Sequence, residues 1–283
     1  MHLSIDQPLD LKSSLESGQA FRWRYVDGWH LGIICGNIVK IRQGPSGLDF
    51  FSHPFSENDM VSNIADYLRL DDPIDAIYEA IIKDDLMTQV VNTHKGLRIL
   101  RQEPWECLVA FICSATSSIP RISATLEALA NQFGAPLSLQ NEIAYDFPNA
   151  EVFANVEESS LRQLGMGFRA KYLYRACRMV ADGQILINEM RGMLYQDAKD
   201  QLMIIPGVGE KIADCTLLFS MDKLQAFPID RWVKRAVEEW YFDGEIMRIE
   251  DIRKWALEYF GDYAGYAQQY LFHSKRLQGK KAS

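Results

Sequence analysis

The sequence lacks the residue patterns that organise a protein around a metal, a disulfide framework or a membrane. Its five cysteines are odd in number and include no CxxC pair, so neither disulfides, zinc nor an iron-sulfur cluster has support. The five histidines show no HxxxH or HxxE spacing. No run approaches the roughly 18 apolar residues that span a bilayer, and the N-terminus has no basic or apolar leader. We therefore expect a cytosolic protein, or a nuclear one in a eukaryote, without a membrane partner.

The order of strand and helix signals predicts an α+β fold. The 283 residues, 48% of them hydrophobic, suffice for one large domain or two smaller ones. From Phe21 to about Phe55 the chain is rich in Trp, Ile, Val and Phe and is punctuated by Gly-containing turns, which indicates an antiparallel sheet. After Glu57 the apolar spacing becomes helical. We expect an N-terminal, mainly antiparallel β domain with trailing helices over residues 1–85 and a helical body over residues 86–283.

A net charge of -8 and a pI near 5.2 look unsuited to a nucleic-acid partner, but the charges are unevenly distributed. Nine acidic residues lie between Glu57 and Asp85, against two basic ones. The segment from Ser159 to Ala181 has five basic residues and no acid. Either run could be a solvated helix face. An acidic total is nevertheless compatible with DNA binding if the basic residues line one face.

The segment from Leu202 to Cys215 predicts a helix-hairpin-helix. An apolar helical stretch leads into Pro206-Gly207-Val208-Gly209, and a second helix follows. Glycines allow the backbone to approach a ligand, and the N–H groups at the start of a helix favour a phosphate. We therefore expect Gly207, Val208 and Gly209 to contact the DNA backbone. An ordinary helix pair with glycine caps is the less specific alternative.

Lys211 lies in the first turn of the second helix, where the helix dipole disfavours a cation. A lysine amine is protonated at neutral pH, and burial beside a positive helix end favours the neutral, nucleophilic form. A surface lysine that reaches a phosphate remains an alternative. Asp230 directly precedes a helical run and is expected to be its N-cap. A carboxylate there would favour the ammonium form of a nearby lysine, so its catalytic value would lie in proton transfer and stabilisation of positive charge.

These segments resemble the helix-hairpin-helix DNA glycosylases with a Lys/Asp pair, and among them the 8-oxoguanine glycosylases. Lys211 is followed 19 residues later by Asp230, as in that family. Similar segments occur in the same order along nearly the whole chain. They are Ser17–Trp23, Arg101–Cys107, Phe111–Ser114, Leu164–Ala170 and Tyr263–Phe272.

The resemblance implies a pocket for a flipped base. Gly18 would direct its carbonyl at N7–H of 8-oxoguanine, a proton that guanine lacks. Gln268 and Phe272 are four residues apart, so an amide that reads the base edge would lie beside a ring that stacks on it. Cys215, four residues after Lys211, would cover the other face of the base. Core packing for Phe272 and Cys215, and a surface position for Gln268, are the alternatives.

The resemblance also implies contacts to the opposite strand, with two departures from the family. Arg121 and Arg169 correspond to residues that contact the orphaned cytosine, and neither has an evident helical or core role. Phe168 corresponds to the residue that wedges into the gap left by the flipped base. The family's asparagine triplet is replaced by Thr116-Ser117-Ser118, and a histidine by Trp232. The first change puts selectivity for cytosine in question, and the second could alter phosphate or pocket contacts.

The expected activity is therefore a bifunctional DNA glycosylase and abasic-site lyase of base excision repair. Its partner would be double-stranded DNA containing oxidised guanine, and we expect a monomer. No organic cofactor is required, although a structural cation could bind the hairpin carbonyls of Ile205 and Val208. An alkylpurine glycosylase of the same fold would not need Lys211. A non-catalytic DNA-binding module would leave Gly18, Asp230 and Gln268 without a joint purpose.

Overall fold

A five-stranded antiparallel sheet forms from the strand-rich N-terminal segment. The computed structural model describes residues 1–281 of the chain. The strands lie in the order β1-β5-β4-β3-β2. Cys35 and Gly36 connect β3 to β4 with positive φ values of 48° and 70°, as tight hairpin turns require. The strands are β1 (His2–Ser4), β2 (Arg24–Val26), β3 (Trp29–Ile34), β4 (Asn37–Gly44) and β5 (Gly47–His53).

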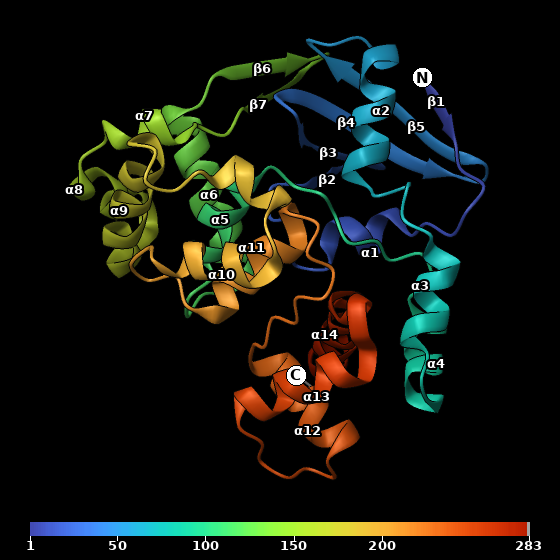
Figure 1. Ribbon diagram of the computed structural model, residues 1–283. Helices are drawn as coiled ribbons and strands as arrows, with labels where there is room; N and C mark the ends of the chain where they lie inside the picture. The colour runs from blue at the N-terminus through green and yellow to red at the C-terminus, as the bar shows by residue number, and fades with distance from the viewer. Residues whose placement is uncertain (282–283) are drawn as a thin grey trace.

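One face of the sheet is covered by two helices, which together with it enclose a first hydrophobic core. Alternate residues of β4 and β5, including Val39 and Phe50, are buried. They belong to the same apolar cluster as Leu15 of α1 (Leu11–Glu16) and Ile64 of α2 (Glu57–Tyr67). Figure 1 shows α2 lying across the sheet.

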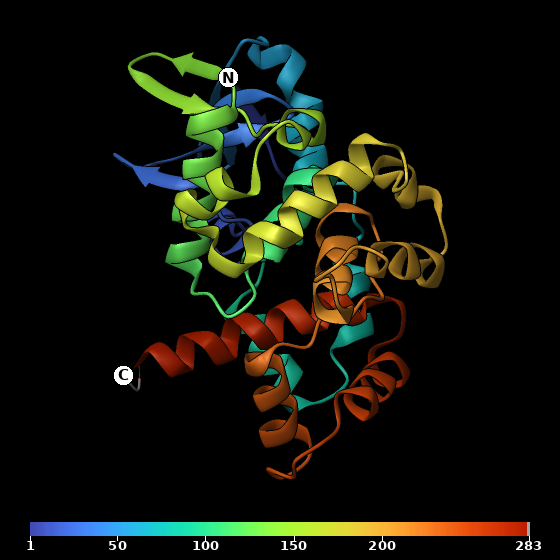
Figure 2. The same cartoon turned by 90° about the vertical axis from the view of Figure 1, so that its left-hand side faces the viewer.

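The remaining helices form a second core around α5 (Pro104–Cys113). Residues 107–113 of α5 are all buried, so this helix is apolar on every side. The ring of Phe111 stacks on Phe219 of α11 at 5.6 Å. Figure 2 shows α14 as the long helix that leads to the C-terminus. The other helices are α3 (Ile74–Ile81), α4 (Asp85–Thr93), α6 (Ile119–Phe133), α7 (Ala150–Ala154), α8 (Glu158–Leu161), α9 (Ala170–Ala181), α10 (Tyr195–Met203), α11 (Glu210–Ser220), α12 (Arg231–Tyr241), α13 (Ile249–Phe260) and α14 (Ala264–Lys281).

The predicted α+β fold is confirmed, with additions at its edges. The edge strand β1 lies before the predicted sheet, and its three residues are too few to show a periodic pattern. A second, two-stranded sheet within the helical part joins β6 (Pro136–Leu139) to β7 (Glu142–Tyr145). Ile74 and Ile77 of α3 pack in the second core, so the two parts share residues on both sides of the predicted boundary at residue 85. That boundary stays a prediction. Within residues 1–281 no helix has the length and apolarity to cross a membrane.

Candidate active site

The hairpin between α10 and α11 has the predicted form. Gly207 has a φ of +87°, and a Cβ at this position would lie 2.4 Å from Cγ of Tyr172 in α9, so only glycine fits without strain. Gly209 is the N-cap of α11. The amide of Val208 donates to the carbonyl of Ile205 at 3.0 Å and is therefore used inside the turn.

The amides that face outward are the neighbours of Val208. Within residues 1–281, the N–H groups of Gly207, Gly209, Glu210 and Lys211 donate to no backbone carbonyl. These four donors, together with the positive end of the helix dipole, are suited to a phosphate. The Val208 N–H is already used inside the turn, and the contact of Gly207, Val208 and Gly209 with the DNA backbone stays a prediction.

Lys211 points from the first turn of α11 towards the end of α5. Its Nζ donates to Oγ of Ser114 at 3.0 Å and lies 5.0 Å from the centroid of the Phe111 ring. The Ser114 hydroxyl in turn donates to the Phe111 carbonyl at 2.6 Å. The Ser114 hydroxyl thus holds the amine beside an aromatic ring. Ser114 was missed as a functional residue, although a polar residue closing an otherwise apolar helix is a usable signal.

Cys215 lies one turn after Lys211 and is buried. Burial raises the pKa of its thiol to about 12, while the positive charge of Lys211 acts in the opposite direction. The thiol is therefore neutral at physiological pH. Such a group can pack on the face of a base but is a poor nucleophile.

Asp230 caps α12 as predicted. Its Oδ1 accepts the N–H groups of Trp232 at 2.8 Å and Val233 at 2.9 Å. Within the described residues, Oδ2 has no hydrogen-bond donor, and the carboxylate forms no ion pair with Lys211. The charges of Asp230 and Lys211 nevertheless both act on Cys215, so the three side chains share one site.

The predicted pocket has two walls. Lys211 and Cys215 of α11 belong to one, and Gly18 and α14 form the other. Gly18 has a φ of +85°, and a Cβ there would lie 3.4 Å from Cε1 of Phe272. Gln268 is only 4% exposed, and its Oε1 is buried without a hydrogen-bond partner in the described part of the chain. A buried amide oxygen of this kind costs free energy unless a ligand supplies a donor.

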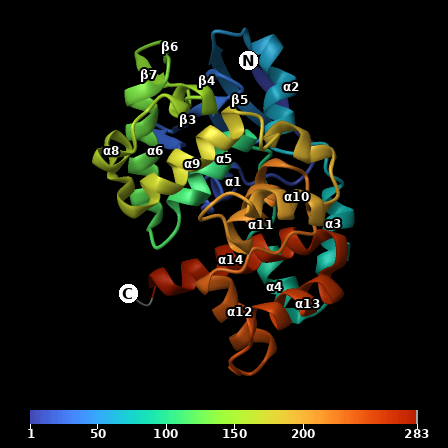
Figure 3. The ribbon, with the colours of Figure 1, turned by 60° about the vertical axis from the view of Figure 1, so that its left-hand side comes forward.

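The two walls are joined where α14 crosses α11. A Cβ at Gly265 of α14 would lie 2.2 Å from Cδ1 of Leu218 in α11, which shows how closely the helices approach. Figure 3 shows α14 passing beside α11. The helix that carries Gln268 and Phe272 thus packs directly against the helix that carries Lys211 and Cys215.

The predicted wedge is exposed, whereas one of the two predicted cytosine contacts is buried. Phe168 is 47% exposed and meets the ring of Tyr172 edge-on at 6.3 Å. Arg121 is exposed in the first turn of α6. Arg169 is only 5% exposed.

The expectation that Arg169 has no packing role is wrong. Its Nε donates to the Ala115 carbonyl at 2.7 Å, and its Nη2 donates to the Thr116 carbonyl at 3.2 Å. Positive φ values at Gly165 and Gly167 bend the chain before Arg169. Arg169 thus holds in place, through these hydrogen bonds, the loop that contains Thr116, Ser117 and Ser118, where the sequence departs from the family.

Trp232, the second departure, lies between α12 and α14. A Cβ at Gly279 would lie 2.7 Å from Cη2 of its indole, so the ring covers the backbone of α14 at this point. The guanidinium carbon of Arg231 lies 5.4 Å from the centroid of this ring. Trp232 therefore joins two helices that flank the site.

A buried ionic network, which the sequence did not predict, fixes the position of α11. Lys199 of α10 lies 3.0 Å from Oδ1 of Asp214 in α11, and the Tyr195 hydroxyl donates to the same oxygen at 2.6 Å. Burial raises the pKa of Asp214, and the charge of Lys199 opposes this effect. Because Lys211 lies on the same helix, this network also orients the amine.

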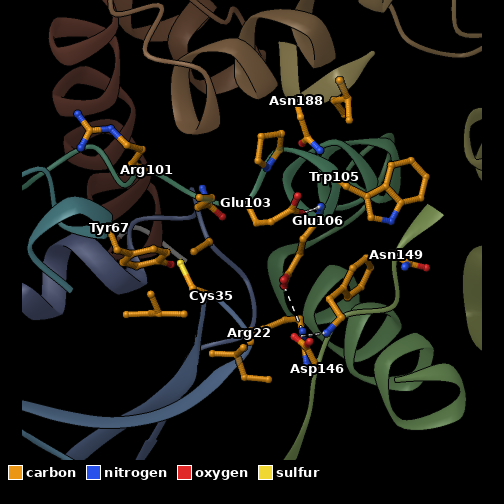
Figure 4. A pocket seen from close by; sticks show the side chains of 18 of the residues that line it. Arg22, Cys35, Tyr67, Arg101, Glu103, Trp105, Glu106, Asp146, Asn149 and Asn188 are labelled. Atoms are coloured by element: carbon orange, nitrogen blue, oxygen red, sulfur yellow. Dashed lines mark hydrogen bonds and ion pairs between the residues drawn. The ribbon is translucent and has the colours of Figure 1, made fainter. Parts of the chain in front are cut away.

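A cavity of about 540 Å³ lies away from these residues, between the sheet and the helical body. Figure 4 shows Arg22 in its wall, beside Glu106. Arg22 forms ion pairs with Glu106 at 3.2 Å and with Glu127 at 3.0 Å. None of the predicted site residues lines this cavity. In the described part of the chain, no group of three or more His, Cys, Asp or Glu side chains is arranged to hold a metal ion.

The fold and the hairpin together define the class of helix-hairpin-helix DNA glycosylases. Residues 2–108 match the family model of the 8-oxoguanine DNA glycosylase N-terminal domain, and residues 109–259 match that of the HhH-GPD superfamily base excision DNA repair proteins. The chain belongs to the 8-oxoguanine DNA glycosylase family within that superfamily.

Individual relatives agree with this assignment over almost the full chain. A structure of MBOgg1 in complex with a low-affinity DNA ligand is 34% identical, with a TM-score of 0.93 over 98% of this chain and 96% of that one. The 8-oxoguanine glycosylase/lyase of Clostridium acetobutylicum, in complex with DNA containing cytosine opposite 8-oxoguanine, is 29% identical, with a TM-score of 0.91 over 99% and 98%. The N-glycosylase/DNA lyase of Saccharomyces cerevisiae is 28% identical over 97% of this chain and 85% of its own.

Proposed function

We propose that the protein excises 8-oxoguanine from duplex DNA and then cleaves the strand at the abasic site, as a bifunctional enzyme of base excision repair. The names of the yeast and clostridial relatives, a glycosylase with lyase activity in both cases, support this activity. The observation that carries the substrate assignment is the buried Oε1 of Gln268, which has no hydrogen-bond partner among the described residues and lies one helical turn from Phe272. A flipped purine that stacks on the ring would present N–H donors to this oxygen.

Lys211 is the proposed nucleophile. The neutral amine attacks C1′ of the lesion nucleotide, so that an N–C1′ bond forms and the C1′–N9 bond breaks. The electron pair of the broken bond leaves with the base, which is then protonated. Asp230 accepts a proton from the amine and stabilises the positive charge that develops on the sugar. Its Oδ2, which plays no part in capping α12, is the oxygen suited to these roles.

The lyase step follows from the covalent intermediate. The nitrogen, which keeps one proton, then forms a double bond to C1′ as the C1′–O4′ bond breaks and O4′ takes up a proton, which gives a protonated Schiff base between Lys211 and C1′. Removal of a proton from C2′ then expels the 3′ phosphate by β-elimination. The chain itself supplies the amine and the carboxylate, so this chemistry needs no organic cofactor.

Recognition of the lesion is assigned to both walls of the pocket. The Gly18 carbonyl accepts N7–H of 8-oxoguanine and repels N7 of guanine, which is an acceptor. Phe272 and Cys215 enclose the two faces of the base, and Gln268 reads its edge.

The rest of the duplex is held by groups outside the base pocket. Phe168 fills the gap in the stack, and Arg121 and Arg169 contact the opposite base. The outward amides of the hairpin bind phosphate, and a cation bound by the Ile205 and Val208 carbonyls would strengthen that contact.

Borohydride trapping on a duplex that contains 8-oxoguanine tests the proposal. We expect a covalent protein–DNA adduct with the parent, because reduction fixes the Schiff base. In Lys211→Gln, we expect excision to fall by more than about a thousandfold while binding of the lesion duplex survives. An adduct retained in Lys211→Gln would assign the nucleophile elsewhere. Release of alkylpurines without any adduct in the parent would instead indicate an alkylpurine glycosylase.

A further inference from the structure

The segment that carries Gly18 is tied to α14 at two points. Nη2 of Arg276 donates to the Glu16 carbonyl at 2.9 Å. Nε2 of Gln269 donates to Oγ of Ser17 at 2.9 Å. Both donors lie on the helix that carries Gln268 and Phe272, although the two segments are about 250 residues apart in the sequence. The backbone before Gly18 is thus held by the same helix as the predicted base-reading side chains.

Arg276 is buried directly against Gly18. The side chain is 7% exposed, and its Nη1 lies 3.4 Å from the position a Cβ would take at Gly18. Its guanidinium carbon is 5.6 Å from the centroid of the Phe272 ring. Burial lowers the pKa of Arg276, and Glu16 opposes this effect. A buried guanidinium costs free energy, and Nε has no hydrogen-bond partner in the described residues, so packing alone does not account for its presence.

The other side of the segment is fixed to the stretch between α4 and α5. Gln19 is fully buried, donates to the Arg98 carbonyl at 2.7 Å and accepts the Leu100 amide at 2.9 Å. These bonds hold the segment against residues 98–100 and make no contact with α14. The distance of the segment from α14 depends on the contacts of Arg276 and Gln269.

We propose that Arg276 is a positioning residue that fixes the Gly18 carbonyl relative to Phe272 and thereby sets the discrimination between 8-oxoguanine and guanine. The inference rests on the proposed function, because it assumes that the carbonyl reads N7–H. A hydrogen bond discriminates only when its acceptor is held at the correct place. Arg276 connects the acceptor to the ring on which the base stacks, so both parts of the reading site move together.

The test compares two bases that differ only at position 7. One duplex carries 8-oxoguanine and the other 7-deaza-8-oxoguanine, which keeps the C8 carbonyl but has a CH2 group in place of N7–H. Both are placed on a 2′-fluoro sugar that resists excision, so that affinities can be measured. We expect the parent to bind the first duplex roughly tenfold more tightly, the value of one buried hydrogen bond. In Arg276→Met the ratio should fall to about twofold, and Arg276→Lys should restore part of it.

Lys275→Met is the matched control. Lys275 is the adjacent residue, is 8% exposed and also ties α14 to a neighbour, through Glu239 of α12 at 2.6 Å. The Lys275→Met variant should keep the ratio of the two affinities at the value of the parent. The circular-dichroism spectrum and melting temperature of Arg276→Met show whether the variant is folded. If that variant does not fold, Gln269→Leu removes the second tie and should lower the ratio in the same way.

The outcomes separate the inference from the function on which it rests. A ratio in Arg276→Met and Gln269→Leu equal to that of the parent would overturn the positioning role. An equal loss of the ratio in Lys275→Met would overturn it as well, because any loosening of α14 would then suffice. If the parent itself neither forms a borohydride adduct nor prefers the lesion duplex, the proposed function fails instead.

Discussion

At the scale of single residues, Asp230 has two roles that one substitution separates. Oδ1 accepts both capping hydrogen bonds of α12, and an asparagine carbonyl can accept them as well. The amide carries no charge, so it cannot stabilise a cationic sugar. We therefore expect Asp230→Asn to lower the single-turnover excision rate about a hundredfold, with little change in affinity or melting temperature. Asp230→Ala should in addition destabilise the protein by about 1 kcal/mol. A parent-like rate in Asp230→Asn would leave the carboxylate with a structural role alone.

The residues opposite the lesion lead to a prediction about specificity. An arginine that makes two hydrogen bonds to a base discriminates by about 1–3 kcal/mol, and cytosine offers two acceptors. Thr116, Ser117 and Ser118 are shorter than asparagine, and their hydroxyls serve as donor or acceptor alike. We expect a real but modest preference for cytosine opposite 8-oxoguanine, which Arg169→Ala flattens further. The preference is measured as the single-turnover excision rate on four duplexes that differ only in the base opposite 8-oxoguanine.

A control is needed because Arg169 also braces the loop at Thr116. Arg121→Ala removes an exposed arginine that makes no such contact, so it should reduce the preference without lowering the melting temperature. Equal rates on all four duplexes in the parent would mean that both arginines bind phosphate alone. A strict requirement for cytosine would mean that the three short side chains do not relax specificity.

At the scale of elements, the hairpin requires glycine at one position and tolerates a side chain at another. An alanine at Gly207 would combine a positive φ with a Cβ 2.4 Å from the Tyr172 ring, so Gly207→Ala should lower the free energy of unfolding by about 1–3 kcal/mol. Gly209 has a φ of -101°, and the space that a Cβ would occupy there is open. Gly209→Ala should therefore melt close to the parent. Chemical denaturation of both variants measures the difference, and equal stabilities would contradict the packing argument.

Features with local sequence signals could be predicted, and features that depend on distant contacts could not. The starts of α11 and α12 follow from Gly209 and Asp230, which are capping residues next to helical runs. Partners far apart in the sequence gave no such signal. The bond from Lys211 to Ser114 spans 97 residues, and that from Arg276 to Glu16 spans 260. Burial of Arg169 also depends on a distant loop, which explains why its packing role was not expected.

At the scale of the whole molecule, the sheet domain and the helical body are held together by charge as well as by apolar packing. Asp222, which follows α11, lies 2.5 Å from Nη2 of Arg69 and 2.8 Å from Nε of Arg101. Arg69 follows α2 and is 1% exposed, and Arg101 precedes α5. Nε of Arg191 lies 3.4 Å from the same carboxylate. Asp222 of the helical body thus pairs with arginines from both parts at their junction.

Asp222→Asn should therefore destabilise the whole protein rather than one element. Burial alone would raise the pKa of Asp222, but the charges of Arg69 and Arg101 outweigh it, and the pKa lies below its ordinary value near 3.8. We expect the substitution to lower the free energy of unfolding by about 2 kcal/mol at pH 7, since the buried Arg69 then keeps only Asp72, at 3.7 Å, as a carboxylate partner among the described residues. A carboxylate with a depressed pKa stabilises the folded state above the ordinary value and loses that contribution as the pH falls through the folded-state pKa. The gap between parent and variant should accordingly shrink below about pH 3.8.

Asp71→Asn provides the comparison for this prediction. Asp71 also pairs with Arg101, at 3.1 Å, but its side chain is 66% exposed. Water screens an exposed pair, so this substitution should cost less than about 1 kcal/mol at pH 7. Urea unfolding of parent and both variants between pH 3 and 7 distinguishes the cases. Equal losses in the two variants would show that burial of Arg69 is not what makes the junction sensitive. A gap for Asp222→Asn that stays constant down to pH 3 would show that the carboxylate charge does not hold the two parts together.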